Sequence, residues 1–255
     1  MLHARNIHKR FGGITAVADV SFDVMPGELV SLIGPNGAGK TTCFNAITGF
    51  TRPTSGRVEF EGVDITGHDA PSIAGRGLVR TFQKTNVLGA LSVFDNVLAG
   101  HYRQGRASLL RTLLPGAAVR RTEARLRESA AELVELVGLG ARMQDEAASL
   151  SCGELRLLEI AVAFGAGPKL LMLDEPAAGL NTAEAVRLGE LLRGLVGARV
   201  QALLLVEHNM ALVMAVSDRV VVINFGQMLA SGTPDEVRRD QGVVEAYLGA
   251  PVVAQ

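Results

Sequence analysis

Residues 34–42 read Gly-Pro-Asn-Gly-Ala-Gly-Lys-Thr-Thr and directly follow an apolar run at 29–33. Four residues separate the first glycine from the glycine that precedes Lys40 and Thr41, which is the spacing of a P-loop. Glycines at this spacing let the backbone curl so that its N–H groups face a phosphate chain, where a Cβ atom would obstruct the approach. The segment therefore predicts a binding site for a nucleoside triphosphate.

The residues of this loop have separate chemical roles toward a phosphate chain. Lys40 supplies a point charge, and the Thr41 hydroxyl is placed to bind Mg²⁺. The helix that we expect to begin here presents its positive end to the same anion. Nucleotide contacts are predicted for Asn36, Gly37, Ala38, Gly39, Lys40, Thr41 and Thr42. The alternative is a glycine-rich turn that binds nothing, and the apolar strand before the loop argues against it.

A pair of carboxylates, Asp174 and Glu175, ends the apolar run 170–173. The carboxyl edge of a parallel sheet is also where a P-loop lies, so Asp174 can hold the Mg²⁺ that Thr41 touches. Glu175 would then lie one residue nearer the γ-phosphate and would orient or polarise an attacking water. A strand-end pair by itself is more often a solvated terminus, and only its combination with the P-loop favours catalysis.

A third segment with anion-binding chemistry is 150–154, which reads Leu-Ser-Cys-Gly-Glu before a helical run at 155–164. Ser151 as the N-cap and Glu154 three residues later make a capping box. A helix N-terminus that carries a serine hydroxyl and a glycine can also receive a phosphate from another molecule.

These groups need elements to position them, and the apolar patterns predict which. Residues 1–33 are expected to form short strands with turns at Gly12-Gly13 and Pro26-Gly27, and residues 57–61 a further strand that closes on Gly62. The unalternating runs 170–173 and 202–206 are typical of strands covered on both faces in a parallel sheet. A helix at 182–195 is expected between these two runs, and a strand at 219–224 and a helix opened by a capping box at 233–236 are expected after them.

The middle of the chain, from about Ser92 to Ala166, has a helical pattern. One helical face is predicted to carry Leu126, Ala130, Leu133, Val134 and Val137, and Gly138 follows as a stop signal. The Arg-rich part of this region, 105–125, is interpreted as a solvated face rather than a nucleic-acid site.

Composition excludes several functional classes. The 255-residue chain is 48% hydrophobic, yet no window approaches the roughly 18 apolar residues of a membrane-spanning helix. A net charge of -1 provides no overall field for nucleic acid or acidic lipid. Cys43 and Cys152 lie in separate motifs and predict no disulfide, and the N-terminus has no apolar signal core. We therefore expect a protein of the reducing cytosol.

The order of these motifs along the chain resembles that of an ABC-type ATPase subunit. The loop at 34–42 comes first, followed by Gln83, the 150–154 segment, the carboxylate pair at 174–175 and His208. The resemblance covers essentially the whole chain, and it implies an α/β P-loop NTPase of ABC type. That fold has a mostly parallel core sheet, an N-terminal antiparallel β subdomain and a helical subdomain insert. The implied layout is a single domain at 1–255, with residues 1–87 and 166–255 as core and β subdomain and about 88–165 as helical subdomain.

The resemblance also implies roles for single residues. Phe11 would stack on the adenine, although an ordinary core phenylalanine is the alternative interpretation. Gln83 would touch Mg²⁺ and mark the hinge into the helical subdomain. His208 would bond the γ-phosphate and position Glu175. The implied catalytic residues are Lys40, Gln83, Glu175 and His208, and the implied Mg²⁺ ligands are Thr41, Gln83 and Asp174.

In the family picture, residues 150–154 are the signature element usually written LSGGQ, which contacts the γ-phosphate of ATP bound to the opposing subunit. The contacts implied here are Ser151, Gly153 and Glu154. Cys152 stands where Gly is commonest, which we interpret as a packing substitution, and Glu154 takes the place of Gln. In the D-loop, 178–181, many members carry Asp where this chain has Asn181.

Finer features resemble the larger ATPase subunit of branched-chain amino acid import systems. They lie in the segments 80–83, 105–121, 157–161, 174–181, 207–210 and 246–249. The resemblance implies uptake of branched-chain (hydrophobic) amino acids, driven by ATP-dependent dimer closure at the cytoplasmic face of the inner membrane. The implied partners are two integral membrane permease subunits, a second ATPase subunit (a paralogue or this chain itself) and, indirectly, an extracytoplasmic substrate-binding protein.

Three alternatives stay open. Related importers move urea or short amides. A soluble ABC protein acting on nucleic acid or the ribosome would usually carry long coiled-coil inserts or two ATPase halves, and this sequence shows neither. A small-molecule kinase or a GTPase uses the same P-loop but would not need the 150–154 segment or His208.

Overall fold

The computed structural model describes residues 1–81, 87–101 and 117–248 of the chain. The described residues pack as two compact units. The first unit comprises residues 1–80, 169–177 and those from 185 onward, and the second comprises 81–168 and 178–184. The D-loop segment therefore packs with the helical part of the chain, which the sequence did not indicate.

An antiparallel sheet forms the N-terminal part of the first unit, with strand order β2-β1-β4-β5. Its strands are β1 (Leu2–Phe11), β2 (Ile14–Val24), β4 (Ser55–Phe60) and β5 (Val63–Asp64). The predicted antiparallel pairing is confirmed, but the expectation of short strands is wrong because β1 and β2 run for 10 and 11 residues. Their pairing shifts register several times, with Asn6 and Asp19 at positive φ. Each register shift interrupts the alternation of inward and outward side chains. A single long strand therefore has the sequence pattern of several short strands.

The second sheet of this unit has the order β10-β9-β3-β8-β7-β6. Its strands are β3 (Leu29–Ile33), β6 (Leu78–Arg80), β7 (Leu170–Asp174), β8 (Ala202–Val206), β9 (Arg219–Asn224) and β10 (Gln227–Gly232). All neighbours pair in parallel except β10, which is antiparallel to β9. Every residue of β3, β7 and β8 is buried, as their unalternating apolar runs predict.

The first unit also contains helices. They are α1 (Lys40–Ile47), α2 (Ala70–Gly75), α7 (Thr182–Leu195), α8 (Met210–Val216), α9 (Pro234–Arg239) and α10 (Gln241–Leu248), and the first three residues of α7 belong to the second unit. The predicted capping box at the start of α9 is present, since Thr233 and Glu236 satisfy each other's backbone N–H groups.

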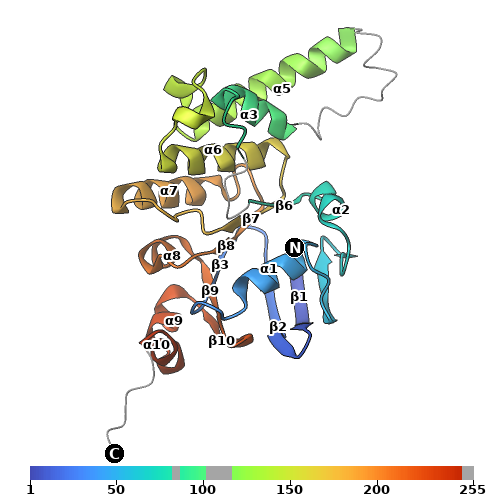
Figure 1. Ribbon diagram of the computed structural model, residues 1–255, viewed down its shortest axis with the longest axis vertical. Helices are drawn as coiled ribbons and strands as arrows, with labels where there is room; N and C mark the ends of the chain where they lie inside the picture. The colour runs from blue at the N-terminus through green and yellow to red at the C-terminus, as the bar shows by residue number, and fades with distance from the viewer. Residues whose placement is uncertain (82–86, 102–116, 249–255) are drawn as a thin grey trace, which may run out of the picture. The chain divides into compact units, whose positions relative to one another are not determined.

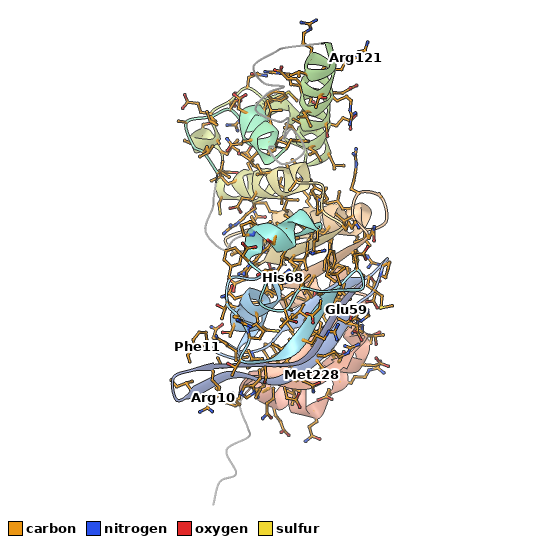
Figure 2. The ribbon with its side chains drawn as sticks, turned by 90° about the vertical axis from the view of Figure 1, so that its right-hand side faces the viewer. Arg10, Phe11, Glu59, His68, Arg121 and Met228 are labelled. Carbon is orange, nitrogen blue, oxygen red and sulfur yellow. The ribbon has the colours of Figure 1, made fainter. Side chains whose placement is uncertain are left out.

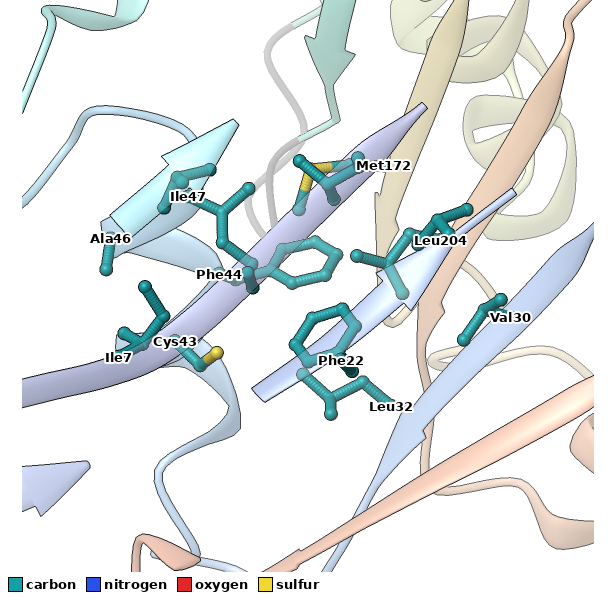
Figure 3. Packing of buried hydrophobic residues seen from close by; sticks show 14 of the residues in the cluster. Ile7, Phe22, Val30, Leu32, Cys43, Phe44, Ala46, Ile47, Met172 and Leu204 are labelled. Atoms are coloured by element: carbon teal, nitrogen blue, oxygen red, sulfur yellow. The ribbon is translucent and has the colours of Figure 1, made fainter. Parts of the chain in front are cut away.

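The main core of the first unit lies between its two sheets, with α1 inside it. Cys43, Phe44 and Ile47 of α1 pack among Phe22 of the antiparallel sheet and Leu204 of the parallel sheet (Figure 3). All five side chains are buried. Truncating a buried aromatic such as Phe44 to alanine costs about 3–5 kcal/mol, so the helix that follows the P-loop is firmly anchored.

The second unit is helical and contains α3 (Val93–Gly100), α5 (Ala117–Leu136) and α6 (Cys152–Gly165), seen together in Figure 1. The predicted face of α5 is confirmed at its C-terminal half, where Ala130, Leu133 and Val134 are buried, whereas Leu126 is only partly buried. The stop signal is confirmed too, because Gly138 has φ +78° just after the helix. Among the described residues, none of the helices has the length and apolarity needed to cross a membrane.

Candidate functional site

The P-loop connects β3 to α1, and its backbone runs too close to neighbouring strands for side chains at two positions. Gly34 has φ +152°, and a Cβ built there would lie 1.9 Å from the Ile223 carbonyl oxygen. Gly39 has φ +101°, and its Cβ would lie 2.4 Å from the Ala16 carbonyl oxygen. Both glycines are therefore required for the loop to keep its curl.

The N-terminus of α1 is open to an anion. Its N-cap is Gly39, which provides no side-chain hydrogen bond, and no acidic residue lies in the first turn. The first N–H groups of the helix consequently have no capping side chain, and the helix dipole adds positive potential. This geometry is that of a cradle for a phosphate group, with Asn36 and Gly37 exposed beside it.

Lys40 lies within this cradle and is only 5% exposed. Its Nζ donates hydrogen bonds to the carbonyl oxygens of Gly34 at 2.8 Å and Pro35 at 3.0 Å. Burial lowers the pKa of Lys40, and the charges of Glu175 and Asp174 partly offset this effect. The predicted carboxylates are thus close enough to act on the P-loop lysine.

The ends of β7 and β8 bring Glu175 and His208 together. Nε2 of His208 and Oε1 of Glu175 are 3.0 Å apart. Glu175 has φ +50°, a left-handed conformation that is uncommon for a residue with a side chain. An outlier of this kind at a strand end supports a functional role for Glu175.

Asp174 is held by an arginine that sequence reasoning missed. Its Oδ2 accepts a hydrogen bond from NH2 of Arg80 at 2.7 Å, and both side chains are buried. Arg80 also donates to Oδ1 of Asn45 at 2.5 Å, and its guanidinium lies 5.2 Å from the centre of the Phe44 ring. The signal available in the sequence was a charged residue ending the short buried strand β6.

The side chains expected to hold Mg²⁺ present the donor chemistry that this ion prefers. The Thr41 hydroxyl and the Asp174 carboxylate are hard oxygen ligands. The described residues contain no cluster of three or more His, Cys, Asp or Glu side chains able to hold a metal. Such a cluster is not needed for Mg²⁺ in a nucleotide site, because that ion keeps waters and phosphate oxygens as its other ligands. Gln83, the other predicted ligand, lies outside the described residues.

The signature residues lie at the N-terminus of α6 in the second unit, where the predicted capping box is confirmed. Oγ of Ser151 accepts the N–H of Glu154 at 3.3 Å, and the Glu154 carboxylate accepts the N–H of Ser151 at 2.8 Å. Arg142 also donates to Glu154 at 3.1 Å. The Ser151 hydrogen bond and the charge of Arg142 hold the pKa of Glu154 below its usual value.

The D-loop segment packs against this N-terminus. A Cβ on Gly153 would lie 2.9 Å from Oε1 of Glu184, so a larger residue at this position would have to displace the Glu184 side chain. Asn181 caps α7, because its Oδ1 accepts the N–H of Glu184 at 3.0 Å. Asparagine caps a helix as well as aspartate does, which accounts for the departure at this position. Cys152 directs its Sγ toward Gly179, as a packing substitution would.

Phe11 lies at the end of β1, beside Arg10 at the tip of the β1–β2 hairpin (Figure 2). It is 51% exposed, with the Lys9 ammonium 4.9 Å from the ring centre. The alternative of an ordinary core phenylalanine is therefore wrong, and the exposed ring already has a cation over one face. The stacking on adenine itself stays a prediction.

Two further residues near the site were missed from the sequence. Glu207 is buried at the end of β8, directly before His208. Tyr247 of α10 has a hydrogen bond with the backbone of Gly34, and burial raises the pKa of its hydroxyl to about 12. A glutamate after five apolar residues was a visible signal for the first, whereas no sequence pattern connects Tyr247 to the P-loop.

Comparison with known proteins agrees with this geometry. Residues 17–178 match the family model described as ABC transporter, and residues 227–253 match that of the Branched-chain amino acid ATP-binding cassette transporter. The chain is 43% identical to the high-affinity branched-chain amino acid transport ATP-binding protein LivG of Salmonella typhimurium, over 98% of both chains. It is 42% identical to BraF of Pseudomonas aeruginosa, again over 98% of both.

A solved structure gives the same result for the fold. The chain is similar to the ADP conformation of MJ1267, an ATP-binding cassette of an ABC transporter, with a TM-score of 0.85 and 34% identity over 98% of both chains. The family model covers the P-loop, the signature element and both carboxylates. The chain therefore belongs to the ABC transporter family, as an ATP-binding ATPase subunit related to the branched-chain amino acid transport ATP-binding proteins.

Proposed function

We propose that this chain hydrolyses ATP to energise an importer for branched-chain (hydrophobic) amino acids. The names of the relatives LivG and BraF and the C-terminal match at 227–253 support this cargo. The cargo itself never touches this subunit, so its identity rests on that relationship. An importer of urea or short amides is the alternative cargo class.

The observation that carries the catalytic proposal is the 3.0 Å contact between Nε2 of His208 and Oε1 of Glu175. The negative charge of Glu175 also raises the pKa of Lys40, against the effect of burial, so Glu175 lies near the P-loop lysine. Lys40 and the open N-terminus of α1 hold the phosphate chain of ATP. Glu175 orients and polarises the attacking water, and His208 bonds the γ-phosphate and keeps Glu175 in place. A positioned general base contributes about 10²–10⁴-fold in rate.

Mg²⁺ belongs to this proposal as well. Thr41 and Asp174 would hold it, with Gln83 as the additional ligand implied by the family. The bound ion would supply charge neutralisation on the β- and γ-phosphate oxygens. Arg80 pairs with the buried Asp174 through Oδ2 of its carboxylate at 2.7 Å, which fixes the orientation of that side chain.

The assembly we propose contains two ATPase subunits and two integral membrane permease subunits, with no nucleic acid. ATP would bridge the P-loop of one subunit and Ser151, Gly153 and Glu154 of the other, and an extracytoplasmic binding protein would deliver the cargo. The subunit would lie peripherally at the cytoplasmic face of the membrane. Closure is driven by phosphate contacts that exist only in the closed dimer. ATP therefore binds the closed dimer more tightly than the open one, and this difference in affinity shifts the equilibrium toward closure.

The catalytic proposal is tested with Glu175→Gln in the full-length chain. We expect hydrolysis to fall at least about 100-fold, while an ATP-bound dimer accumulates in size-exclusion chromatography. Glu190→Gln, an exposed glutamate on α7, removes the same charge and should change neither property. Native hydrolysis by Glu175→Gln would remove Glu175 from the mechanism.

The cargo is tested separately by transport. In a strain lacking this subunit, uptake of leucine, isoleucine and valine should be lost and should return when the gene is restored. Unchanged amino acid uptake with lost urea uptake would move the assignment to the amide importers. Co-purification with ribosomes or DNA, in place of two membrane proteins, would reject transport altogether.

A further inference from the structure

The buried carboxylate of Glu207 accepts hydrogen bonds from two different loops. Glu207 is 3% exposed and follows β8 directly. Its Oε1 accepts the backbone N–H of Ala177 at 2.6 Å, and its Oε2 accepts the N–H groups of His208 at 2.9 Å and Asn209 at 3.2 Å. One carboxylate therefore connects the loop that carries Glu175 with the loop that carries His208.

The turn at Glu175 depends on this connection. The N–H of Glu175 donates to the carbonyl oxygen of Val206 at 2.8 Å, and Pro176 has no N–H to donate. The next available donor is Ala177, which bonds Glu207. The left-handed conformation of Glu175 thus lies between two hydrogen bonds to the end of β8, and strain of about 1–3 kcal/mol persists only where the surroundings fix it.

We propose that Glu207 is a positioning residue that sets the placement of Glu175 against His208 for ATP hydrolysis. This inference rests on the roles of Glu175 and His208 in the proposed function. A carboxylate suits the task because it only accepts hydrogen bonds and has enough lone pairs for three donors. Burial among N–H groups also removes the competition of water, so its bonds hold their geometry.

Two variants change this carboxylate in different ways. Glu207→Gln keeps the shape but turns an NH₂ group toward at least one of the N–H donors, which leaves that contact repulsive. Glu207→Asp retains the charge and can bond the N–H of Asn209 two residues on, but it is too short to reach Ala177 as well. The aspartate variant therefore breaks mainly the bond between the two loops.

Both variants should lower kcat for ATP by about 10- to 100-fold, since displacing a catalytic group by about 1 Å costs up to 100-fold. KM for ATP should stay unchanged, because Glu207 lies outside the P-loop cradle. The matched control is Thr233→Ala, which removes the capping box of α9 and lowers Tm without changing kcat. If Glu207→Gln does not fold, Glu207→Asp and the same measurements apply.

A double-mutant cycle with His208→Ala separates positioning from general stability. If Glu207 acts through His208 and Glu175, Glu207→Gln should cost less than about threefold in kcat once His208 is absent, because residues that act as a unit are non-additive. An equal loss of kcat in both backgrounds, or a native kcat in the single variant, would overturn the proposal.

Glu175→Gln measured alongside keeps the two proposals distinguishable. If Glu175→Gln is inactive while Glu207→Gln is native, only the positioning role fails. If Glu175→Gln hydrolyses ATP at the native rate, the catalytic assignment itself fails, whatever Glu207 does.

Discussion

The helix N-termini of α1 and α6 share a predicted ligand, the phosphates of ATP, but solve their hydrogen bonding in opposite ways. α1 begins at Gly39 without a side-chain cap, whereas α6 begins with the complete capping box of Ser151 and Glu154. The first helix leaves its donors for the ligand, and the second satisfies them internally. We therefore expect α1 to bind the phosphates strongly. α6 can add only a phosphate contact that leaves its capping box intact.

The Ser151 hydroxyl allows such a contact. Its oxygen accepts the N–H of Glu154, and the O–H proton can still be donated to a phosphate oxygen. The charges differ as well, because Lys40 lies at α1 while the carboxylates of Glu154 and Glu184 lie at α6. Arg142 offsets the charge of Glu154. A comparison of the two helices predicts that ATP binds first at α1 and engages α6 only on dimer closure.

The largest effect should follow from Lys40→Ala. Charge-assisted hydrogen bonds to phosphate are worth about 1.5–3 kcal/mol each, so the loss of two of them should lower ATP affinity at least about 100-fold. Fluorescent nucleotide titration of the monomer measures this directly. Lys169→Ala, an exposed lysine paired with Glu61, is the matched charge control. Native affinity in Lys40→Ala would contradict the view that α1 holds the nucleotide.

A smaller loss, confined to the dimer, is expected for Ser151→Ala. Removing the O–H donor should lower hydrolysis by about 10-fold or more and leave nucleotide affinity of the monomer unchanged. The lost N-cap should also cost about 1 kcal/mol of stability. Ser92→Ala removes the N-cap of α3 in the same unit and should lower Tm without affecting hydrolysis. Equal effects of Ser151→Ala and Ser92→Ala on hydrolysis would show that Ser151 acts only as a helix N-cap.

Glu154→Gln should change hydrolysis by less than about threefold, because an amide oxygen can still accept the Ser151 N–H. Its stability effect depends on pH. The folded-state pKa of Glu154 lies below its ordinary value in the unfolded chain, so the ionised carboxylate stabilises α6 at pH values above that ordinary pKa. This contribution disappears as pH falls through the lower folded pKa. The Tm difference between the native chain and Glu154→Gln should therefore be present at pH 7 and vanish in strong acid; a difference that grows in acid would reverse the assignment.

The smallest effect is expected for Cys152→Gly. The thiol is exposed, its Sγ lies near Gly179 and donates a weak hydrogen bond to the Ala178 carbonyl oxygen at 3.9 Å, so glycine here removes only packing and that weak bond. Hydrolysis should stay within about twofold, the range of ordinary surface substitutions. Activity should also be insensitive to thiol-modifying reagents in Cys152→Gly. A large loss would show that the sulfur has a role beyond packing.

Much of this architecture could be predicted because it depends on residues that are close together in the sequence. The unalternating runs of β7 and β8 predicted a buried parallel sheet, and the serine and glutamate spacing predicted the cap of α6. Arg80 and Glu207 could not be assigned, because their partners Asp174 and Ala177 lie 94 and 30 residues away in the sequence. Only the neighbouring strands bring such residues together.

The position of β3 in its sheet has a consequence for synthesis of the chain. β3 leads into the P-loop, yet its neighbours are β8 and β9, at residues 202–206 and 219–224. Because these pairings are distant in sequence, the emerging chain presents its P-loop long before the strands that hold it exist. We expect ribosome-bound chains arrested before β8 to retain no ATP, and chains released after β9 to retain it. The nucleotide site would then form only after β9 has been synthesised.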